Sequence, residues 1–198
     1  MTLPPVSRPR AALAAVAGTA LVLGLLLGAA GAEPKRGGTL RAVFGADPPT
    51  LDPAQATDTT SSAVIRQIFD GLLELDERLQ VRGALAQRWT VSPDHRVYTF
   101  HLRGGVRFHN GRELVAPDVK YSFERAARGK RPWVFEKIRG APEFIRGRAV
   151  EIAGIRVVDD RTVEIALDRP FAPFEYLLAY DAASIVPRLW VMTMNCVR

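Results

Sequence analysis

The sequence WTVSPDHRVYTFHLRGGVRFHNG, residues 89–111, carries the clearest structural signal in the chain. Residues 97–102 alternate in the manner of a strand with one buried face, which places Tyr98, Phe100 and Leu102 on one side and Val97, Thr99 and His101 on the other. The residues SPD at 92–94 and NG at 110–111 favour tight turns, because proline fixes φ while asparagine and glycine tolerate a positive φ. The stretch therefore predicts two hairpin-like connections in a small antiparallel sheet.

The composition is typical of a folded globular protein. The 198 residues are 47% hydrophobic and 24% charged, which suits one domain or slightly more and argues against long disorder. The formal net charge is +6; residues 1–32 hold Arg8, Arg10 and no acid, so the rest of the chain has 25 of the 27 basic residues against 21 acidic ones, or +4. The basic residues form no stripe with aromatics, so we expect no nucleic-acid partner.

The first 32 residues are predicted to be an export signal and not part of the fold. Arg8 and Arg10 precede an uncharged apolar run over residues 11–30, and Ala-Gly-Ala at 30–32 fits the small-residue cleavage pattern. An uncleaved anchor is the alternative, because about 20 apolar residues can just span a bilayer. We expect the protein to be periplasmic or extracellular.

A proline-rich loop is predicted near the start of the mature chain. Residues 39–44 alternate like a strand, and GADPPTLDP follows at 45–53. Its prolines exclude regular structure, so the segment is either a ligand-facing loop or a simple crossover connection. A helix is then expected to run to Leu73, with Thr59, Thr60 or Ser61 as its cap and its apolar face in the core.

Further elements follow from periodicity and turn residues. A short strand at 73–76, pairing with 79–81, and a helical turn at 84–89 are expected before the central strand block. After it we expect helices at 118–127, 142–146 and 174–180, and a hairpin of residues 155–158 and 162–167. Pro117 stands where a helix start favours proline, and Gly147 stands where a helix ends.

Two stretches between these elements each have two interpretations. Residues 125–131 carry four positive charges near Gly129, so they form either a solvated loop, the simpler interpretation, or an anion-binding site. Residues 132–135 place Trp133 and Phe135 beside a proline in a loop. These aromatics either line a cleft or anchor the loop to the core.

The sequence lacks the patterns of known catalytic and metal sites. His101 and His109 flank a turn without a third ligand at a metal-binding spacing, and Cys196 is the only cysteine. There is no nucleophile elbow, phosphate-binding glycine loop or zinc-binding helix motif, and turn formation explains Asp159 and Asp160. We therefore expect no cofactor, no metal and no enzymatic activity.

With these residues in place, the chain resembles the peptide- and nickel-type (family 5) solute-binding proteins that supply ABC importers. The matching motifs occur in the family's order: GGTL at 37–40, LDP at 51–53, FDGL at 69–72, LAQRW at 85–89, SPD at 92–94, YTFHLR at 98–103, FHNG at 108–111, DVKYSF at 118–123, GI at 154–155, DDRTV at 159–163 and VP at 186–187. The resemblance covers residues 37–188. One departure is Ala116, where members usually have a capping Thr or Ser.

The resemblance implies an α/β, periplasmic-binding-protein-like fold (class II, large peptide-binding type) with two lobes that close on a ligand. Residues 33–56 would begin the first lobe, 57–167 would form an extra α/β subdomain, and 168–188 would return into the first lobe. The implied ligand is a peptide or another small solute. The implied partner is an ABC-transporter permease, with membrane contact only through that permease or an uncleaved signal.

The resemblance also gives four candidate ligand-binding residues. Asp47 matches a position where some peptide-binding members hold the ligand's ammonium group with an acid, and a carboxylate in a closing cleft makes a strong charge-assisted bond to such a cation. Pro49 and Thr50 share the cleft-side loop with Asp47. Trp133 lies in a segment that approaches the ligand in some members.

The end of the chain departs from the family pattern. Members are much longer, and the resemblance stops after Arg188; residues 189–198 hold two of the three methionines and the only cysteine. We expect an aberrant tail here, produced by a frameshift or early stop in a longer gene. Three functions are therefore considered: solute capture for import, a truncated fragment that does not bind, and, remotely, a secreted hydrolase.

Overall fold

The computed structural model describes residues 37–39 and 41–188, and the chain divides into two units, Met1–Val43 and Phe44–Arg198. The described residues of the first unit are exposed and lie outside helices and strands. The strand predicted at 39–44 is therefore wrong for the residues described, because none of them has a neighbouring strand to share its backbone hydrogen bonds. The predicted signal at 1–32 and the tail at 189–198 lie outside the described residues.

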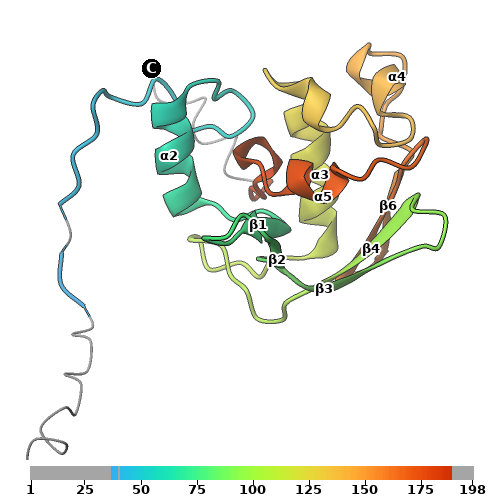
Figure 1. Ribbon diagram of the computed structural model, residues 1–198, viewed down its shortest axis with the longest axis horizontal. Helices are drawn as coiled ribbons and strands as arrows, with labels where there is room; N and C mark the ends of the chain where they lie inside the picture. Colours follow the sequence, from blue (N-terminus) through green and yellow to red (C-terminus); the bar gives the residue numbers. More distant parts are fainter. Residues whose placement is uncertain (1–36, 40, 189–198) are drawn as a thin grey trace, which may run out of the picture. The chain divides into compact units, whose positions relative to one another are not determined.

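The second unit is built around a four-stranded antiparallel sheet (Figure 1). Its strands, in spatial order, are β3 (Ala86–Val91), β4 (Val97–Leu102), β6 (Thr162–Ala166) and β5 (Ile155–Asp159). The predicted alternation is confirmed in β4, because Tyr98, Phe100 and Leu102 are buried and the residues between them are only half-buried. The predicted hairpin of 155–158 and 162–167 is confirmed as β5 and β6.

Strand β3 occupies residues for which we predicted a helical turn, so that prediction is wrong. Trp89 pairs with Phe100 of β4, and Val91 pairs with Tyr98. Alanine, leucine and glutamine are good helix formers, but intrinsic propensity is a weak determinant that tertiary contacts often override. Pairing with the half-buried central strand β4 overrides that preference.

The two predicted turns both form, but only the first joins two strands. Between β3 and β4, the Ser92 hydroxyl donates to the Asp94 carboxylate, and this hydrogen bond lowers the pKa of Asp94. In the second turn Gly111 has a φ of +83°, which glycine adopts without strain. The chain on either side meets only at an isolated bridge between Arg107 and Glu113, so the second hairpin is shorter than predicted.

Helix α3 (Ala116–Ala127) packs against β5 and β6. Its buried residues include the four predicted to face the core, Val119, Ser122, Phe123 and Ala126. The Asp118 carboxylate accepts a hydrogen bond from the backbone N–H of Val115 at 3.0 Å and takes two from the Arg112 guanidinium at 2.9 and 2.7 Å. Asp118 therefore satisfies the backbone N–H of the cap residue, which is Val115, so Ala116 lies inside the helix and not at its cap.

Helix α2 (Thr59–Ile68) begins as predicted but has a different cap and ends earlier. Asp58 is the cap, since its carboxylate accepts a hydrogen bond from the backbone N–H of Ser61 at 2.8 Å. The predicted caps Thr59, Thr60 and Ser61 instead lie in the first turn of the helix. The predicted end at Leu73 is wrong, because the chain becomes extended at Phe69.

After α2 the chain passes close to another segment. A Cβ at Gly71 would lie 3.0 Å from the carbonyl oxygen of Leu178, so a side chain at this position would crowd that backbone. Strand β1 (Leu73–Leu75) follows and pairs with β2 (Val81–Gly83). The predicted short strand pair is thus confirmed, with its second strand shifted by two residues.

Short helices surround this framework. They are η1 (Pro132–Val134), α4 (Ala141–Ile145), α5 (Phe174–Leu178) and η2 (Asp181–Ala183), and α4 and α5 confirm the helices predicted at 142–146 and 174–180. The buried segment 181–187 connects the chain that follows α2 to α3, since the N–H of Ile185 donates to Asp70 O and that of Val186 to the Ser122 hydroxyl, each at 2.9 Å. None of the helices in the described part is long and apolar enough to cross a membrane.

Candidate functional site

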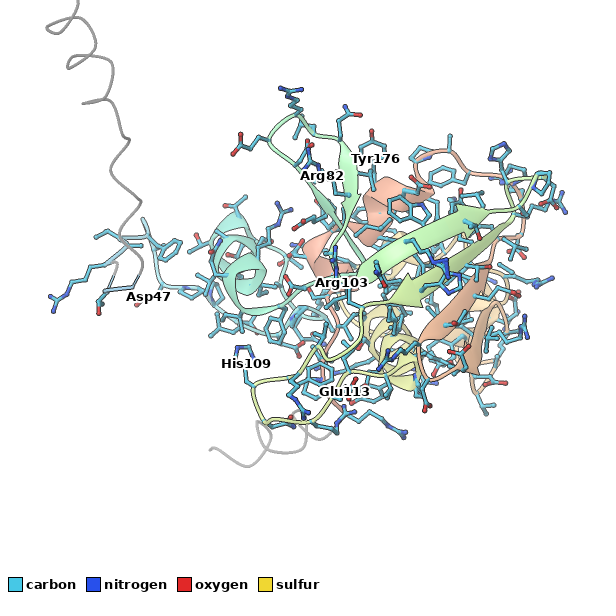
Figure 2. All side chains as sticks on the ribbon, turned by 90° about the horizontal axis from the view of Figure 1, so that it is seen from below. Asp47, Arg82, Arg103, His109, Glu113 and Tyr176 are labelled. Atoms are coloured by element: carbon cyan, nitrogen blue, oxygen red, sulfur yellow. The ribbon has the colours of Figure 1, made fainter. Side chains whose placement is uncertain are left out.

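The predicted ligand-facing loop lies on the chain that leads into α2 (Figure 2). Asp47 and Pro49 are exposed, and Thr50 is half-buried. The backbone N–H of Thr50 donates to the Ser61 hydroxyl at 3.4 Å, and the Thr50 hydroxyl accepts from the N–H of Asp52 at 3.1 Å. These bonds attach the loop to the start of α2 while the Asp47 side chain stays exposed.

The end of the loop is held against α3. The Arg125 guanidinium donates to both carboxylate oxygens of Asp52, at 2.7 and 2.5 Å, and this hydrogen bonding raises the pKa of Arg125. The carbonyl oxygen of Ala54 accepts from the N–H of Lys130 at 2.8 Å, and a Cβ at Gly129 would lie only 2.1 Å from that oxygen. Only glycine permits this approach, so the loop and the end of α3 are locked together.

A polar pocket of about 330 Å³ opens beside α2; its lining residues are Thr57, Asp58, Thr59, Ser62, Ala63, Arg66, Arg131, Tyr180 and Asp181. Arg131 donates to both carboxylate oxygens of Asp181, at 2.8 and 2.9 Å, and the Ser62 hydroxyl donates to the same carboxylate at 2.7 Å. The side chains of Arg131 and Asp181 are 12% and 1% exposed. Two nearly buried charges are stable here because each neutralises and hydrogen-bonds the other.

The solvated-loop interpretation of residues 125–131 is wrong for two of its four cations. Arg125 pairs with Asp52, and Arg131 pairs with Asp181. The partners lie 73 and 50 residues away in the sequence, so the charge run itself does not reveal them.

The two aromatics of the following segment have different roles. Phe135 is fully buried, with its ring centroid 5.2 Å from that of Phe123, so it anchors the segment to the core. Trp133, in η1, is 44% exposed, and its ring meets that of Tyr180 edge to face at 5.5 Å. Tyr180 is itself 39% exposed and lines the polar pocket, so Trp133 and Tyr180 form an aromatic pair beside that pocket.

Adjacent serines of α2 connect the two predicted site regions. Ser61 contacts the loop at Thr50, and Ser62 contacts Asp181 in the pocket. Across the part of the chain that the structure describes, no hydrogen bond, ion pair or ring contact joins the loop directly to Trp133.

Sequence reasoning missed the ion pair that forms the pocket's inner wall. Arg131 was treated as part of a basic run, and Asp181 was not singled out. One signal was available: Asp181 opens the apolar run DAASIV, and a carboxylate in a buried apolar segment requires a cationic partner. The partner's identity comes only from the fold.

The pocket offers groups for binding a polar solute. Thr59 supplies a hydroxyl, Arg66 a guanidinium and Tyr180 an aromatic face, while the Ser62 hydroxyl already donates to Asp181. The Asp181 carboxylate is committed to Arg131 and Ser62, so it is not available as a general base. Within the described ranges, no group of three or more His, Cys, Asp or Glu side chains could hold a metal ion.

Comparison with known proteins agrees with these features. A family model described as "Bacterial extracellular solute-binding proteins, family 5 Middle" matches residues 80–193. Di/tripeptide-binding protein 4 of Pseudomonas aeruginosa is 38% identical over 174 residues, which are 83% of this chain and 32% of that protein. A probable deoxycholate-binding periplasmic protein of Escherichia coli, YgiS, is 33% identical over 148 residues, covering 71% of this chain and 28% of that protein.

A solved structure shows the same relationship in three dimensions. The unliganded open form of the Escherichia coli periplasmic murein tripeptide-binding protein MppA superposes with a TM-score of 0.72 at 30% identity, covering 76% of this chain and 30% of that one. The α/β periplasmic-binding-protein-like fold expected from the resemblance is therefore confirmed, and this chain spans about 30% of the length of MppA. The chain belongs to the bacterial extracellular solute-binding proteins of family 5, whose members bind solutes and are not enzymes.

Proposed function

We propose that this chain belongs to the binding component of an ABC importer, which captures a short peptide or a similar small solute outside the cytoplasmic membrane and delivers it to a permease. Family membership supports solute binding, and two relatives are named for binding di/tripeptides and a murein tripeptide. The single observation that carries the proposal is the polar pocket beside α2, whose Arg131–Asp181 wall is already paired and which adjoins an exposed aromatic pair.

This geometry favours binding over reaction. Because the Arg131–Asp181 pair fixes the pocket wall before a ligand arrives, little ordering cost remains to be met on binding. In this proposal Asp47 holds the ammonium group of the ligand, and Pro49 and Thr50 shape the loop around it. Trp133, backed by Tyr180, packs against an apolar part of the ligand.

The proposal includes export to the periplasm or cell exterior by a cleaved signal at residues 1–32. The relative YgiS is named as a periplasmic protein, which supports this location. N-terminal sequencing of the secreted protein should begin at Glu33. A secreted product that begins at Met1 would contradict cleavage.

Calorimetry with a mixture of dipeptides and tripeptides tests solute capture. We expect saturable binding to the chain, weakened in Trp133→Ala, which loses one ring of the aromatic pair. Val150→Ala is the matched control, because Val150 is 92% exposed and does not line the polar pocket. Equal binding by both variants would exclude Trp133 from the site, and turnover of peptide by pure protein would indicate a hydrolase instead.

A second candidate is a fragment that does not bind by itself. The observation that favours it is the exposure of two apolar residues just before the loop, Val43 at 97% and Phe44 at 46%. Such residues normally pack against another element. Calorimetry with the same peptides tests this alternative. A heat of binding from a protein extended to the length of the relatives, with no heat of binding from the 198-residue chain, would support it.

A further inference from the structure

The aromatic pair beside the polar pocket comes from two segments that are distant in sequence. Trp133 belongs to η1, and Tyr180 is the residue that precedes η2. In the described part of the chain, no backbone hydrogen bond connects these two short helices. Their buried residues hold both helices against the core, while contacts of polar and aromatic side chains set how the two rings meet.

The Arg131 side chain contacts both the Tyr180 ring and the residue next to it. Its guanidinium donates to both carboxylate oxygens of Asp181, at 2.8 and 2.9 Å. The same guanidinium lies over the Tyr180 ring, 5.4 Å from the ring centroid, where the ring face attracts a cation. Because Arg131 is only two residues before Trp133, one side chain ties the segment of one ring to the other ring.

The donors of Arg131 are already occupied, whereas the two rings remain open to solvent. Besides its bonds to Asp181, Arg131 donates to the Ser62 hydroxyl at 3.3 Å, and its side chain is only 12% exposed. Trp133 and Tyr180 are 44% and 39% exposed. Arg131 can therefore influence a ligand through the rings that it holds.

We propose that Arg131 is a positioning residue that fixes the Tyr180–Trp133 ring pair and thereby gives the site a preference for peptides with an aromatic side chain. The inference rests on the proposed function and adds this ligand class. A ring that is free to change rotamer must be ordered when a ligand binds, and a ring that is already held avoids this cost. Aromatic rings also attract each other beyond their buried area when they meet offset or edge to face, a geometry that requires a fixed ring.

Calorimetry with the full chain tests the preference by comparing alanyl-phenylalanine with alanyl-leucine. We expect the first peptide to bind about threefold to tenfold more tightly, because an aromatic pair contributes this much beyond apolar burial. The double variant Arg131→Met with Asp181→Asn removes the guanidinium without leaving a buried unpaired carboxylate, and it should lose most of the preference. Arg131→Lys keeps a cation near the ring and should retain part of the preference.

The matched control is the double variant Arg112→Met with Asp118→Asn. This pair has the same bidentate geometry, at 2.9 and 2.7 Å, and does not line the polar pocket, so the preference should persist.

Fluorine NMR of protein containing 5-fluorotryptophan is a second readout, which a merely stabilising role of the ion pair would not change. Trp133→Phe identifies one of the three tryptophan resonances. This resonance should shift or broaden in the Arg131→Met with Asp181→Asn variant, because the Tyr180 ring beside it is no longer held. It should stay unchanged in the control variant.

The outcomes separate the inference from the proposed function. A preference and a Trp133 resonance that both survive the loss of Arg131 would overturn the positioning role and leave solute capture intact. Loss of the preference in the control variant as well would also overturn it, because general destabilisation would then explain the effect. Equal affinity for the two peptides in the unaltered chain would overturn the ligand class. Absence of binding by both peptides would contradict the proposed function and the ligand class together.

Discussion

The four-stranded sheet with α3 and the region around α2 are held together by different interactions. In the first region, fully buried apolar side chains from β4, β6 and α3 form the core, among them Phe100, Phe123, Val163 and Ile165. In α2 only Ser61 and Ile65 are buried, and its neighbourhood is fixed by polar contacts. Asp52 reaches Arg125, 73 residues away, and Ser62 reaches Asp181, 119 residues away.

This difference determines what each region contributes. A hydrophobic core gains stability from apolar area and needs no single partner, so the sheet serves as the scaffold. A network of paired charges fixes the positions of polar groups but adds little net stability relative to an apolar core. The polar region beside α2 is therefore suited to presenting a preformed binding surface.

The largest effect is expected from removing a side chain at the centre of the sheet. Phe100 is fully buried, with its ring 6.4 Å from those of Trp89 and Tyr98. Phe100→Ala should lower the free energy of unfolding by about 4 kcal/mol, because apolar burial is lost and a cavity remains. Urea unfolding followed by circular dichroism measures this. Thr99→Ala, on the other face of β4, should cost less than about 1 kcal/mol, and equal losses would contradict a sheet with one buried face.

A somewhat smaller effect is expected from breaking the buried pair in the pocket. Arg131→Met leaves the Asp181 carboxylate buried without its cation, which should cost about 3 kcal/mol. Adding Asp181→Asn should recover part of this loss, because the uncompensated charge is then gone. A double-mutant cycle in urea measures the coupling. Strictly additive losses would show that the pair does not fix this region.

The cap of α2 should give a smaller, pH-dependent effect. Hydrogen bonding from the backbone N–H of Ser61 lowers the pKa of Asp58, so this cap contributes stability above the unfolded pKa, about 3.9, and loses it as pH falls through the lower folded value. Asp58→Ala should melt at a lower temperature than the unaltered chain at pH 7. The difference should shrink in melting curves recorded in steps below about pH 4. A difference that grows in acid would contradict the cap assignment.

The smallest effect is expected at an exposed ion pair. The guanidinium of Arg146, the residue that follows α4, lies 3.9 Å from the carboxylate of Glu143 within the helix. The two side chains are 58% and 56% exposed. Arg146→Ala should change the free energy of unfolding by less than about 0.5 kcal/mol, because solvent screens the pair. Urea unfolding in low and high salt checks this. If Arg146→Ala lowered the free energy of unfolding as much as Arg131→Met does, exposed and buried ion pairs would not differ in their contribution to stability.

The same contrast explains which parts of the fold could be predicted from sequence. The alternation around Phe100 and the face of α3 through Val119 and Phe123 are local patterns, and both are confirmed. Strand β3 was taken for a helical turn because its pairing with β4 is not visible in its own residues. The apolar spacing of α2 continues to Leu73, so the change to extended backbone at Phe69 is not visible in the pattern itself.

Of the candidate site, the residue pattern points only to the aromatic segment, and it leaves open whether these rings line a cleft or anchor the loop. The structure places the Trp133 ring against Tyr180, and its role in ligand binding stays a prediction. Asp47 is a single charge whose role depends on neighbours from elsewhere in the chain. For that reason the resemblance, and not the residue pattern, identifies Asp47 as a candidate.

Hydrogen exchange with and without saturating alanyl-phenylalanine shows whether a peptide binds beside α2 or elsewhere, because it reports on the α2 region and the sheet in one experiment. We expect slower amide exchange at residues 57–66 and 180–181, two segments that contribute to the lining of the polar pocket, and unchanged exchange in β3, β4, β5 and β6. Protection confined to the sheet, or no change around α2 when the peptide is bound, would contradict this expectation.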